Sequence, residues 1–288
     1  MKNRWLTILL EVLLALGVCL ILYPSVSNYW NEINSARASG TYLEQMENVG
    51  AEAYQAIRSE AEAYNRDLLK NTYRWGVTDE DHERYQSTLK VGETETIGII
   101  QVPRIKLAIP IRHGTEEETL RTAIGHFEGS SLPVGGASTH CVLTGHRGLP
   151  SAKLFSDLDQ LSAGDRFTLT VLGDVLTYEI DRILTVEPED LAPLAIEEGR
   201  DLCTLVTCTP YGVNTHRLLV RGHRVQQEEQ SEIRVISDAV LIEPEIVAPV
   251  IGALIAAFLL AGMFLAPFFR YGRKRLRPDQ KSNKKNEL

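Results

Sequence analysis

Two long apolar stretches near the ends of the chain confine its water-soluble fold to the residues between them. The C-terminal stretch, residues 246–269, contains no charged side chain. At 1.5 Å per residue, a helix of that length spans about 36 Å, more than the roughly 30 Å hydrocarbon core of a bilayer. The N-terminal stretch, residues 1–23, is apolar for most of its length but carries Glu11. We therefore predict a transmembrane helix near each end, the first acting as a signal anchor.

The first stretch has an alternative interpretation as a cleaved signal peptide. A cleavage site of that kind requires small residues shortly after the apolar run. The nearest such pattern is Ala36-Arg37-Ala38, well downstream of Tyr23. This distance favours an uncleaved anchor.

Charge is distributed unevenly along the chain and indicates the topology. The tail after the second stretch, residues 270–288, is rich in Lys and Arg, and Lys2 and Arg4 precede the first stretch. Positively charged flanks are retained in the cytoplasm, so we expect both termini there and the acidic middle outside the cell. A basic tail directly after a membrane span indicates topology and contact with anionic lipid, and we expect no nucleic-acid binding.

Composition divides the region between the two spans. In residues 24–70 apolar side chains recur at three- and four-residue steps, which predicts a helical spacer with breaks near Gly40 and Gly50. Residues 71–95 are polar and irregular, which is typical of a loop, and they contain Trp75. Residues 227–245 are acidic and form the expected linker to the second span.

Residues 96–226 are predicted to form the folded β domain. Expected strands cover residues 97–102, 105–111, 140–146, 166–172, 175–186, 202–208 and 218–225. Residues 116–122 and 150–161 have helical spacing, and Gly173-Asp174 indicates a hairpin turn. About eight short strands with only brief helices predict a mostly antiparallel sheet or barrel.

The segment from Thr204 to Val220 is the strongest candidate for chemistry. Its pattern predicts a strand, a loop and a second strand, with Cys208 ending the first strand and Arg217 beginning the second. A thiolate is a nucleophile, and a guanidinium beside it would stabilise an oxyanion in acyl transfer. The structural alternatives are a buried, inert thiol and an ordinary surface ion pair.

A Cys nucleophile requires a base, and His146 is the best placed of the seven histidines. It follows an apolar strand within Thr144-Gly145-His146-Arg147-Gly148, where the two glycines leave room around the imidazole. His126 has a similar setting between Gly125 and Phe127 and is the nearest rival. His216 adjoins Arg217, so it would face the opposite side of an extended strand. A structural role remains the alternative for each histidine.

A zinc site is a weaker interpretation of the same residues. Cys203 and Cys208 are five positions apart, as are Cys141 and His146. That spacing is not typical of zinc ligands and places the two side chains on opposite faces of a strand. We therefore expect no metal, and the residues alone indicate a membrane-tethered outer β domain with a Cys-His-Arg site.

The sequence resembles the class C, pilin-polymerising sortases. The run Thr204-Leu205-Val206-Thr207-Cys208 followed by Arg217 is similar to the sortase signature, and the segment around His146 is similar to the one that carries the sortase histidine. Further similar stretches cover residues 102–111, 125–136, 149–155 and 186–190, together with the pair Tyr64-Asn65 and the C-terminal span. The resemblance extends from about residue 24 to residue 270.

The resemblance implies an eight-stranded sortase-type β-barrel with an N-terminal helical region. It implies a cysteine transpeptidase that cuts a Leu-Pro-x-Thr-Gly-like motif between Thr and Gly. Cys208 would be the nucleophile, His146 the general acid and base, and Arg217 the group that holds the carbonyl or oxyanion. A lysine amine of the next pilin would resolve the thioacyl intermediate and form an isopeptide bond. The family's motifs imply no metal or organic cofactor.

One feature departs from the class C pattern. Those enzymes usually carry a lid with an Asp-Pro-aromatic motif before the barrel, and residues 71–95 contain no proline. Trp75 lies at a similar distance from the barrel, so we treat it as a hypothetical lid residue. The alternative is a site that is always open.

Three other functions remain compatible with the sequence. The same chemistry would serve a sortase that anchors surface proteins to the cell wall, and resolution by water instead of an amine would make a cysteine hydrolase. In a different class, the barrel would be a catalytically idle surface module that only binds.

Overall fold

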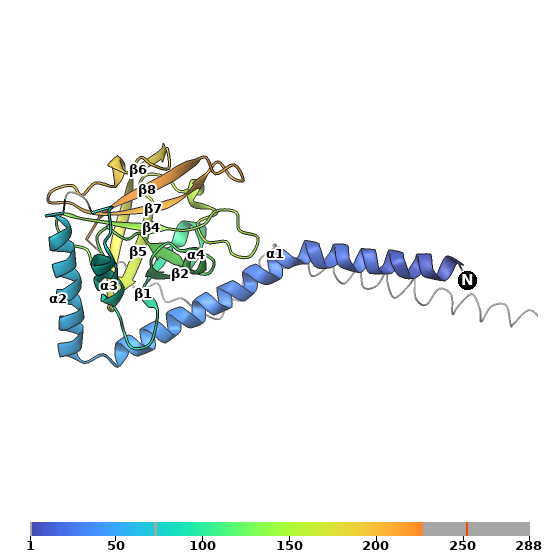
Figure 1. Ribbon diagram of the computed structural model, residues 1–288, viewed down its shortest axis with the longest axis horizontal. Coiled ribbons are helices and arrows are strands. Elements are labelled where there is room, and N and C mark those ends of the chain that lie inside the picture. The colour runs from blue at the N-terminus through green and yellow to red at the C-terminus, as the bar shows by residue number, and fades with distance from the viewer. Residues whose placement is uncertain (1, 72–73, 227–251, 253–288) are drawn as a thin grey trace, which may run out of the picture. The chain divides into compact units, whose positions relative to one another are not determined.

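The computed structural model describes residues 2–71, 74–226 and Gly252 (Figure 1). The described residues from Ser27 onward to residue 226 belong to one globular unit, and residues 2–26 belong to another unit. The predicted linker 227–245 and the predicted tail 270–288 lie outside the described residues, as does the second predicted span except for Gly252.

Eight strands of the globular unit close into a barrel in the order β1-β2-β3-β4-β7-β8-β6-β5. The bounds are β1 Thr96–Val102, β2 Leu107–His113, β3 Ile124–His126, β4 Thr139–Thr144, β5 Arg166–Val171, β6 Asp174–Val186, β7 Asp201–Thr209 and β8 His216–Arg224. The predicted eight-stranded barrel is thus confirmed. Its interior is filled by fully buried side chains such as Phe155, Phe167 and Tyr178.

The barrel is mixed, whereas the strand pattern predicted a mostly antiparallel sheet. β2 pairs in parallel with β3, and β4 pairs in parallel with β7. The other six neighbouring pairs are antiparallel. Strand periodicity reports which residues face the core but not which strand lies next to which, so the two parallel pairs were not visible in it.

The predicted hairpin turn at Gly173-Asp174 joins β5 to β6. Leu172 and Gly173 both have positive φ, 51° and 83°, between the paired residues Val171 and Asp174. This is the geometry of a two-residue hairpin turn whose twist matches the flanking strands, so the β5–β6 hairpin is confirmed.

The predicted helix over residues 150–161 was wrong. This segment consists of turns and the 3₁₀ helix η2 Leu158–Gln160. Leu154 has a φ of 38°, which breaks a right-handed helix, and Phe155 N–H donates to the carbonyl of His146. Leu154, Leu158 and Leu161 are nevertheless buried, so their helical spacing reflects burial through a series of turns. The strand β3 was not expected because three residues are too few for a periodic signal.

Four α-helices accompany the barrel: α1 Lys2–Glu47, α2 Ala51–Leu68, α3 Asp79–Ser87 and α4 Glu117–Leu120. The helical break near Gly50 is confirmed, whereas α1 continues through Gly40 without a break. α2 and α3 pack on the same side of the barrel, where the rings of Tyr64 and Tyr85 lie 6.2 Å apart (Figure 1). Asn65 of α2 forms two hydrogen bonds with the backbone of Leu132 and so ties this helix to the barrel.

α3 lies within residues 71–95, which the composition had marked as irregular. It begins with a capping box in which the Thr78 hydroxyl accepts from Asp81 N–H and Asp81 accepts from Thr78 N–H. Tyr85 is fully buried, and its hydroxyl accepts from Gly114 N–H at 2.9 Å. The helix is therefore a packed part of the globular unit.

Among the residues that the structure describes, one helix is long and apolar enough to cross a membrane, and it is α1. This agrees with the predicted N-terminal anchor. The two-span topology stays a prediction, because the second predicted span lies outside the described residues apart from Gly252.

A buried histidine ties the β6–β7 connection to the barrel and makes it sensitive to acid. His140 Nδ1–H donates to the carbonyl of Ala195, and Nε2 accepts from the Thr204 hydroxyl, both at 2.7 Å. The bond from the Thr204 hydroxyl needs the neutral imidazole, because a protonated ring has no nitrogen left to accept it. Burial lowers the pKa of His140 to about 4 from its usual 6.5.

We predict that the protein loses stability as the pH falls from about 6.5 to about 4. In this window His140 is protonated in the unfolded chain but stays neutral in the folded protein. The free energy of unfolding therefore decreases by about 1–3 kcal/mol. Burial also lowers the pKa of His113, to about 3, and this acts in the same direction. Urea unfolding of the full chain in detergent at a series of pH values measures the slope.

His140→Gln should flatten this slope without abolishing it, because His113 remains. His82→Gln is the control: His82 is an exposed histidine whose pKa is raised by its hydrogen bond to Glu128, so its loss should not flatten the slope. An unchanged slope in His140→Gln would contradict the assignment.

Candidate active site

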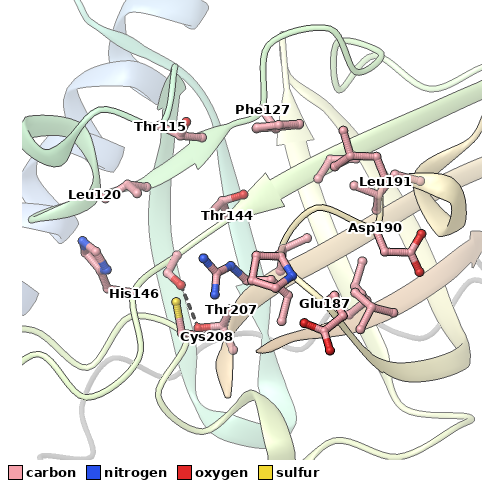
Figure 2. A pocket seen from close by; sticks show the side chains of 18 residues that line it. Thr115, Leu120, Phe127, Thr144, His146, Glu187, Asp190, Leu191, Thr207 and Cys208 are labelled. Carbon is pink, nitrogen blue, oxygen red and sulfur yellow. Dashed lines mark hydrogen bonds between the residues drawn. The ribbon is translucent and has the colours of Figure 1, made fainter. Parts of the chain in front are cut away.

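A cavity of about 380 Å³ opens at the end of the barrel where β4 and β7 end and β8 begins (Figure 2). Its walls come from these strands, from α4 and from the β6–β7 connection. Cys208, His146 and Arg217, the three residues singled out in the sequence, all line this cavity. Trp75 does not line it.

Cys208 and Arg217 are brought together by the β7–β8 ladder. They are direct partners in the antiparallel register, so their side chains point to the same face of the barrel wall. Arg217 Nη1 donates to the carbonyls of Asn214 and His216, at 3.3 and 3.1 Å, and both bonds hold the guanidinium at the start of β8. A half-buried thiol therefore lies next to a fixed cation.

His146 reaches the same end of the barrel by the parallel ladder between β4 and β7. Thr144, the last residue of β4, pairs with Val206, and His146 follows Thr144 by two residues just as Cys208 follows Val206. Gly145 N–H donates to the Val206 carbonyl at 3.1 Å, and the Thr207 hydroxyl donates to the Gly145 carbonyl at 2.8 Å. In Figure 2, His146 and Cys208 lie at one end of the cavity, and Asp190 and Leu191 lie toward the other.

The imidazole of His146 has an acidic neighbour. Its Nε2 lies 3.4 Å from Glu117 Oε2 and has no hydrogen bond in the described part of the chain. The Arg121 guanidinium, which donates a hydrogen bond to Glu117, and the nearby His146 imidazole lower the pKa of this carboxyl group. A half-exposed histidine with a ring nitrogen left without a hydrogen bond is suited to proton transfer.

The acidic stretch 187–200 forms one wall of the cavity. It contains the 3₁₀ helix η3 Ala192–Leu194 and is tied to the barrel by Arg221, whose side chain is 8% exposed. This guanidinium binds both carboxylate oxygens of Asp181 at 2.9 Å and Glu197 Oε1 at 2.6 Å. Paired donors of this kind fix direction as well as distance, so the wall is held in place.

The floor of the cavity is apolar. Val142, Val206, Leu219 and Leu194 form a buried cluster there, separate from the main core of the barrel. An apolar floor beside a thiol, an imidazole and a guanidinium is suited to bind an apolar side chain next to these polar groups.

Trp75 borders the cavity from outside. Its ring lies 5.3 Å from that of Phe127, which lines the cavity, and the Arg74 guanidinium stacks on it at 4.4 Å. Arg74 also donates to the Leu194 carbonyl at 2.8 Å. The loop passes so close to the barrel that a Cβ on Gly129 would meet the Arg74 carbonyl at 2.4 Å. The residues around Trp75 thus cover one side of the cavity wall.

The rival residues have structural roles. His126 is fully buried, and its ring nitrogens are bound by the Tyr85 hydroxyl and the Ser131 carbonyl. Cys141 and Cys203 are buried partners in the β4–β7 register. Within the described ranges, no group of three or more His, Cys, Asp or Glu side chains is arranged to hold a metal ion.

Glu117, Glu187 and Asp190 are neighbours of the site that no local pattern in the sequence indicates. Glu117 lies in the run Glu116-Glu117-Glu118, and nothing in that run distinguishes the residue that faces His146. The other two lie in residues 186–190, a stretch that resembles the class C sortases but whose local pattern does not place it beside Cys208. Only the closure of the barrel brings both segments to the cavity.

Known proteins that resemble this chain share both its sequence and its fold. A family model described as "Sortase domain" matches residues 100–225. The crystal structure of sortase C1 from Streptococcus agalactiae is 48% identical, with a TM-score of 0.65, and the match covers 67% of this chain and 100% of that one. Sortase C of Clostridium perfringens, determined with the C-terminal cell wall sorting motif, is 38% identical, with a TM-score of 0.59 over 66% and 99% of the two chains. Sortase D of Bacillus subtilis is 27% identical over 50% of this chain and 72% of its own length.

We predict that Gly145→Ala disturbs the segment that carries His146. A Cβ at this position would lie 2.7 Å from Ile124 and 2.8 Å from the ring of Phe155, so the strand end or the ring must move. Overpacking of this kind should lower the free energy of unfolding by about 1–3 kcal/mol. Gly40→Ala is the control, because its Cβ would meet nothing within 4 Å on helix α1 and should stabilise by about 0.5–1 kcal/mol. Thermal unfolding of both variants measures the difference, and equal effects would contradict the prediction.

Proposed function

The chain belongs to the sortase family of cysteine transpeptidases, and from this premise we propose that it cuts a Leu-Pro-x-Thr-Gly-like sorting motif between Thr and Gly and joins pilin subunits through a lysine amine. The observation that carries the proposal is the meeting of Cys208, His146 and Arg217 around one cavity. Class C sortases are its structural neighbours, which favours pilin assembly over cell-wall anchoring.

In the first half of the proposed reaction, the Cys208 thiolate attacks the carbonyl carbon of the motif's Thr. Arg217 donates hydrogen bonds to the oxyanion of the tetrahedral intermediate, where a fixed cation stabilises developing charge. The C–N bond to Gly then breaks, and protonated His146 gives its proton to the departing amine. A thioester between Cys208 and the Thr remains.

In the second half, the side-chain amine of an acceptor lysine attacks the thioester. His146, now neutral, takes a proton from this amine. The C–S bond breaks, an isopeptide bond forms and the Cys208 thiolate is regenerated. Water in place of the amine would give hydrolysis, so the outcome depends on which nucleophile reaches the thioester first.

The apolar floor supports the assignment of a sorting motif as substrate. Val142, Val206 and Leu219 line the cavity beside Cys208 and are suited to an apolar side chain such as the Leu of the motif. The C. perfringens relative was determined with the C-terminal cell wall sorting motif.

We further propose that the protein acts at the outer face of the cell membrane. The apolar N-terminal part of α1 would anchor it in lipid, the barrel over residues 96–226 would lie outside the cell and both termini would lie in the cytoplasm. Its partners would be pilin or surface proteins that carry the sorting signal. The helical spacer 24–70 would then connect the anchor to the barrel.

The first test follows the thioester. With a Leu-Pro-x-Thr-Gly peptide and a lysine-containing acceptor, Cys208→Ala should form neither thioester nor product by mass spectrometry. His146→Ala should slow the reaction by about 10²–10⁴-fold and Arg217→Ala by about 10²–10³-fold. Arg66→Ala is the control, because Arg66 is exposed on α2 and should leave the rate unchanged. Product from Cys208→Ala, or hydrolysis alone with the parent protein, would contradict the proposal.

A second test concerns Trp75, which we propose is part of a lid. The contact between Trp75 and Phe127 should stabilise a covered cavity by about 0.5–1.5 kcal/mol, as aromatic pairs do. Trp75→Ala should therefore raise kcat/KM for a short sorting peptide by about 2- to 10-fold. Val77→Ala, an exposed change in the same loop, serves as the control. Equal rates for Trp75→Ala and the parent would show that Trp75 is no lid.

A further inference from the structure

Within the globular unit, α1 runs along the barrel from one end to the other. Near residue 27, Asn31 Nδ2 donates to the Ser151 carbonyl and Asn28 Oδ1 accepts from Lys153 N–H at 2.9 Å. Fifteen residues after Ser27, the Tyr42 hydroxyl donates to the Ile97 carbonyl and accepts from Leu172 N–H. The direction of α1 along the barrel is therefore fixed at both ends.

The strand register shows which end is which. On β6, Val186 pairs with Arg217 at the cavity, whereas Leu172 lies in the hairpin turn before Asp174, at the opposite end of the same strand. Ser151 and Lys153 belong to the segment after His146, which closes back on that residue because Phe155 N–H donates to its carbonyl at 3.1 Å. The chain thus enters the globular unit at the active-site end of the barrel.

Exposed apolar side chains gather around the same segment. Tyr29 and Trp30 of α1 are 53% and 61% exposed, and they flank the helical positions that hold Ser151 and Lys153. Tyr211 and Val213 of the β7–β8 loop are each 65% exposed. We call these four residues the apolar rim.

Tyr211 is in contact with the segment after His146. A Cβ on Gly148 would lie 2.8 Å from the Tyr211 ring, and the Arg147 guanidinium lies 5.9 Å from the centre of that ring. Both parts of the apolar rim therefore border the segment 147–153. Large apolar side chains left in water at this density mark an interaction surface.

We propose that the apolar rim rests in the headgroup region of the membrane, so that the active-site end of the barrel faces the lipid. Ser27 follows the apolar stretch that ends at Tyr23 by only a few residues, so only a short length of chain separates the rim from the proposed membrane anchor. Trp and Tyr are the residues enriched in the headgroup region, because their rings are apolar and their N–H or O–H groups stay hydrated. This inference rests on the membrane anchoring proposed above.

The orientation has a consequence for the substrate. A sorting motif attached to the same membrane is presented at the level of the cavity, whereas a soluble peptide has to find the narrow space between barrel and lipid. The apolar rim would thereby favour substrates that are themselves held at the membrane.

Quenching by brominated lipid tests the orientation. The full chain contains three tryptophans, so Trp5→Phe, Trp30→Phe and Trp75→Phe together give a tryptophan-free background. Tyr211→Trp then places one reporter in the apolar rim, and Val175→Trp places one at the other end of the barrel, where Val175 is 40% exposed next to Asp174. Both proteins are reconstituted in phosphatidylcholine vesicles with and without bromine near the headgroup end of the acyl chains.

The reporter at position 211 should lose a large part of its fluorescence in brominated vesicles, and the reporter at position 175 should lose none. Quenching at neither position, or equally at both, would overturn the proposal. Flotation of the vesicles and cleavage of a soluble sorting peptide are measured on the same samples. A protein that floats and cleaves but shows no quenching at position 211 therefore refutes the orientation and leaves the proposed function standing.

A variant of the rim gives a second, independent measurement. Tyr211→Ser combined with Val213→Ser removes two exposed apolar side chains outside the catalytic machinery. It should lower the rate on a lipid-tethered sorting peptide several-fold and leave the rate on the soluble peptide unchanged. Equal loss on both peptides would indicate damage to the active site and would contradict a role of the rim in favouring membrane-held substrates.

Discussion

The parallel pairing of β4 with β7 is the constraint on which the rest of the site depends. Parallel strands cannot be joined by a tight turn, so the chain between them has to cross over, and here it forms the β5–β6 hairpin and the acidic connection. Because both strands point the same way, their C-terminal ends lie at one end of the barrel. Cys208 lies near the C-terminal end of β7 and His146 just beyond that of β4, so the parallel pairing brings both residues to that end of the barrel.

The crossover also builds the walls of the cavity. Its last part, residues 187–200, would be a solvated loop on charge alone, but Arg221 and His140 bind it to the barrel. On the opposite side, α4 brings Glu117 to His146, and Leu120 of the same helix lines the cavity. Paired hydrogen bonds therefore fix the wall that borders the apolar floor and the Cys208 thiol. A rigid wall of this kind is suited to a reaction in which the reacting groups must be held in a fixed geometry.

The sequence predicted those parts of the site that are local. Cys208 and Arg217 lie on neighbouring strands joined by a short loop, so their proximity follows from a hairpin pattern. His146 could be chosen from its setting, but its register with Cys208 depends on a pairing between strands about sixty residues apart. His126 had an equally suggestive setting, and only burial and its hydrogen bonds to Tyr85 and Ser131 assign it to the core.

By itself, the sequence determined the apolar N-terminal stretch, the strand-rich middle, the β5–β6 hairpin and the identity of a Cys, a His and an Arg suited to acyl transfer. These features depend on composition and on hydrophobic periods of a few residues, both of which can be recognised within a short segment of sequence. The tertiary structure alone decided the two parallel pairs, the turns in place of a helix over residues 150–161, the wall of the cavity and the end of the barrel at which the chain enters. Each of these depends on contacts between residues far apart in the chain, which no local period encodes.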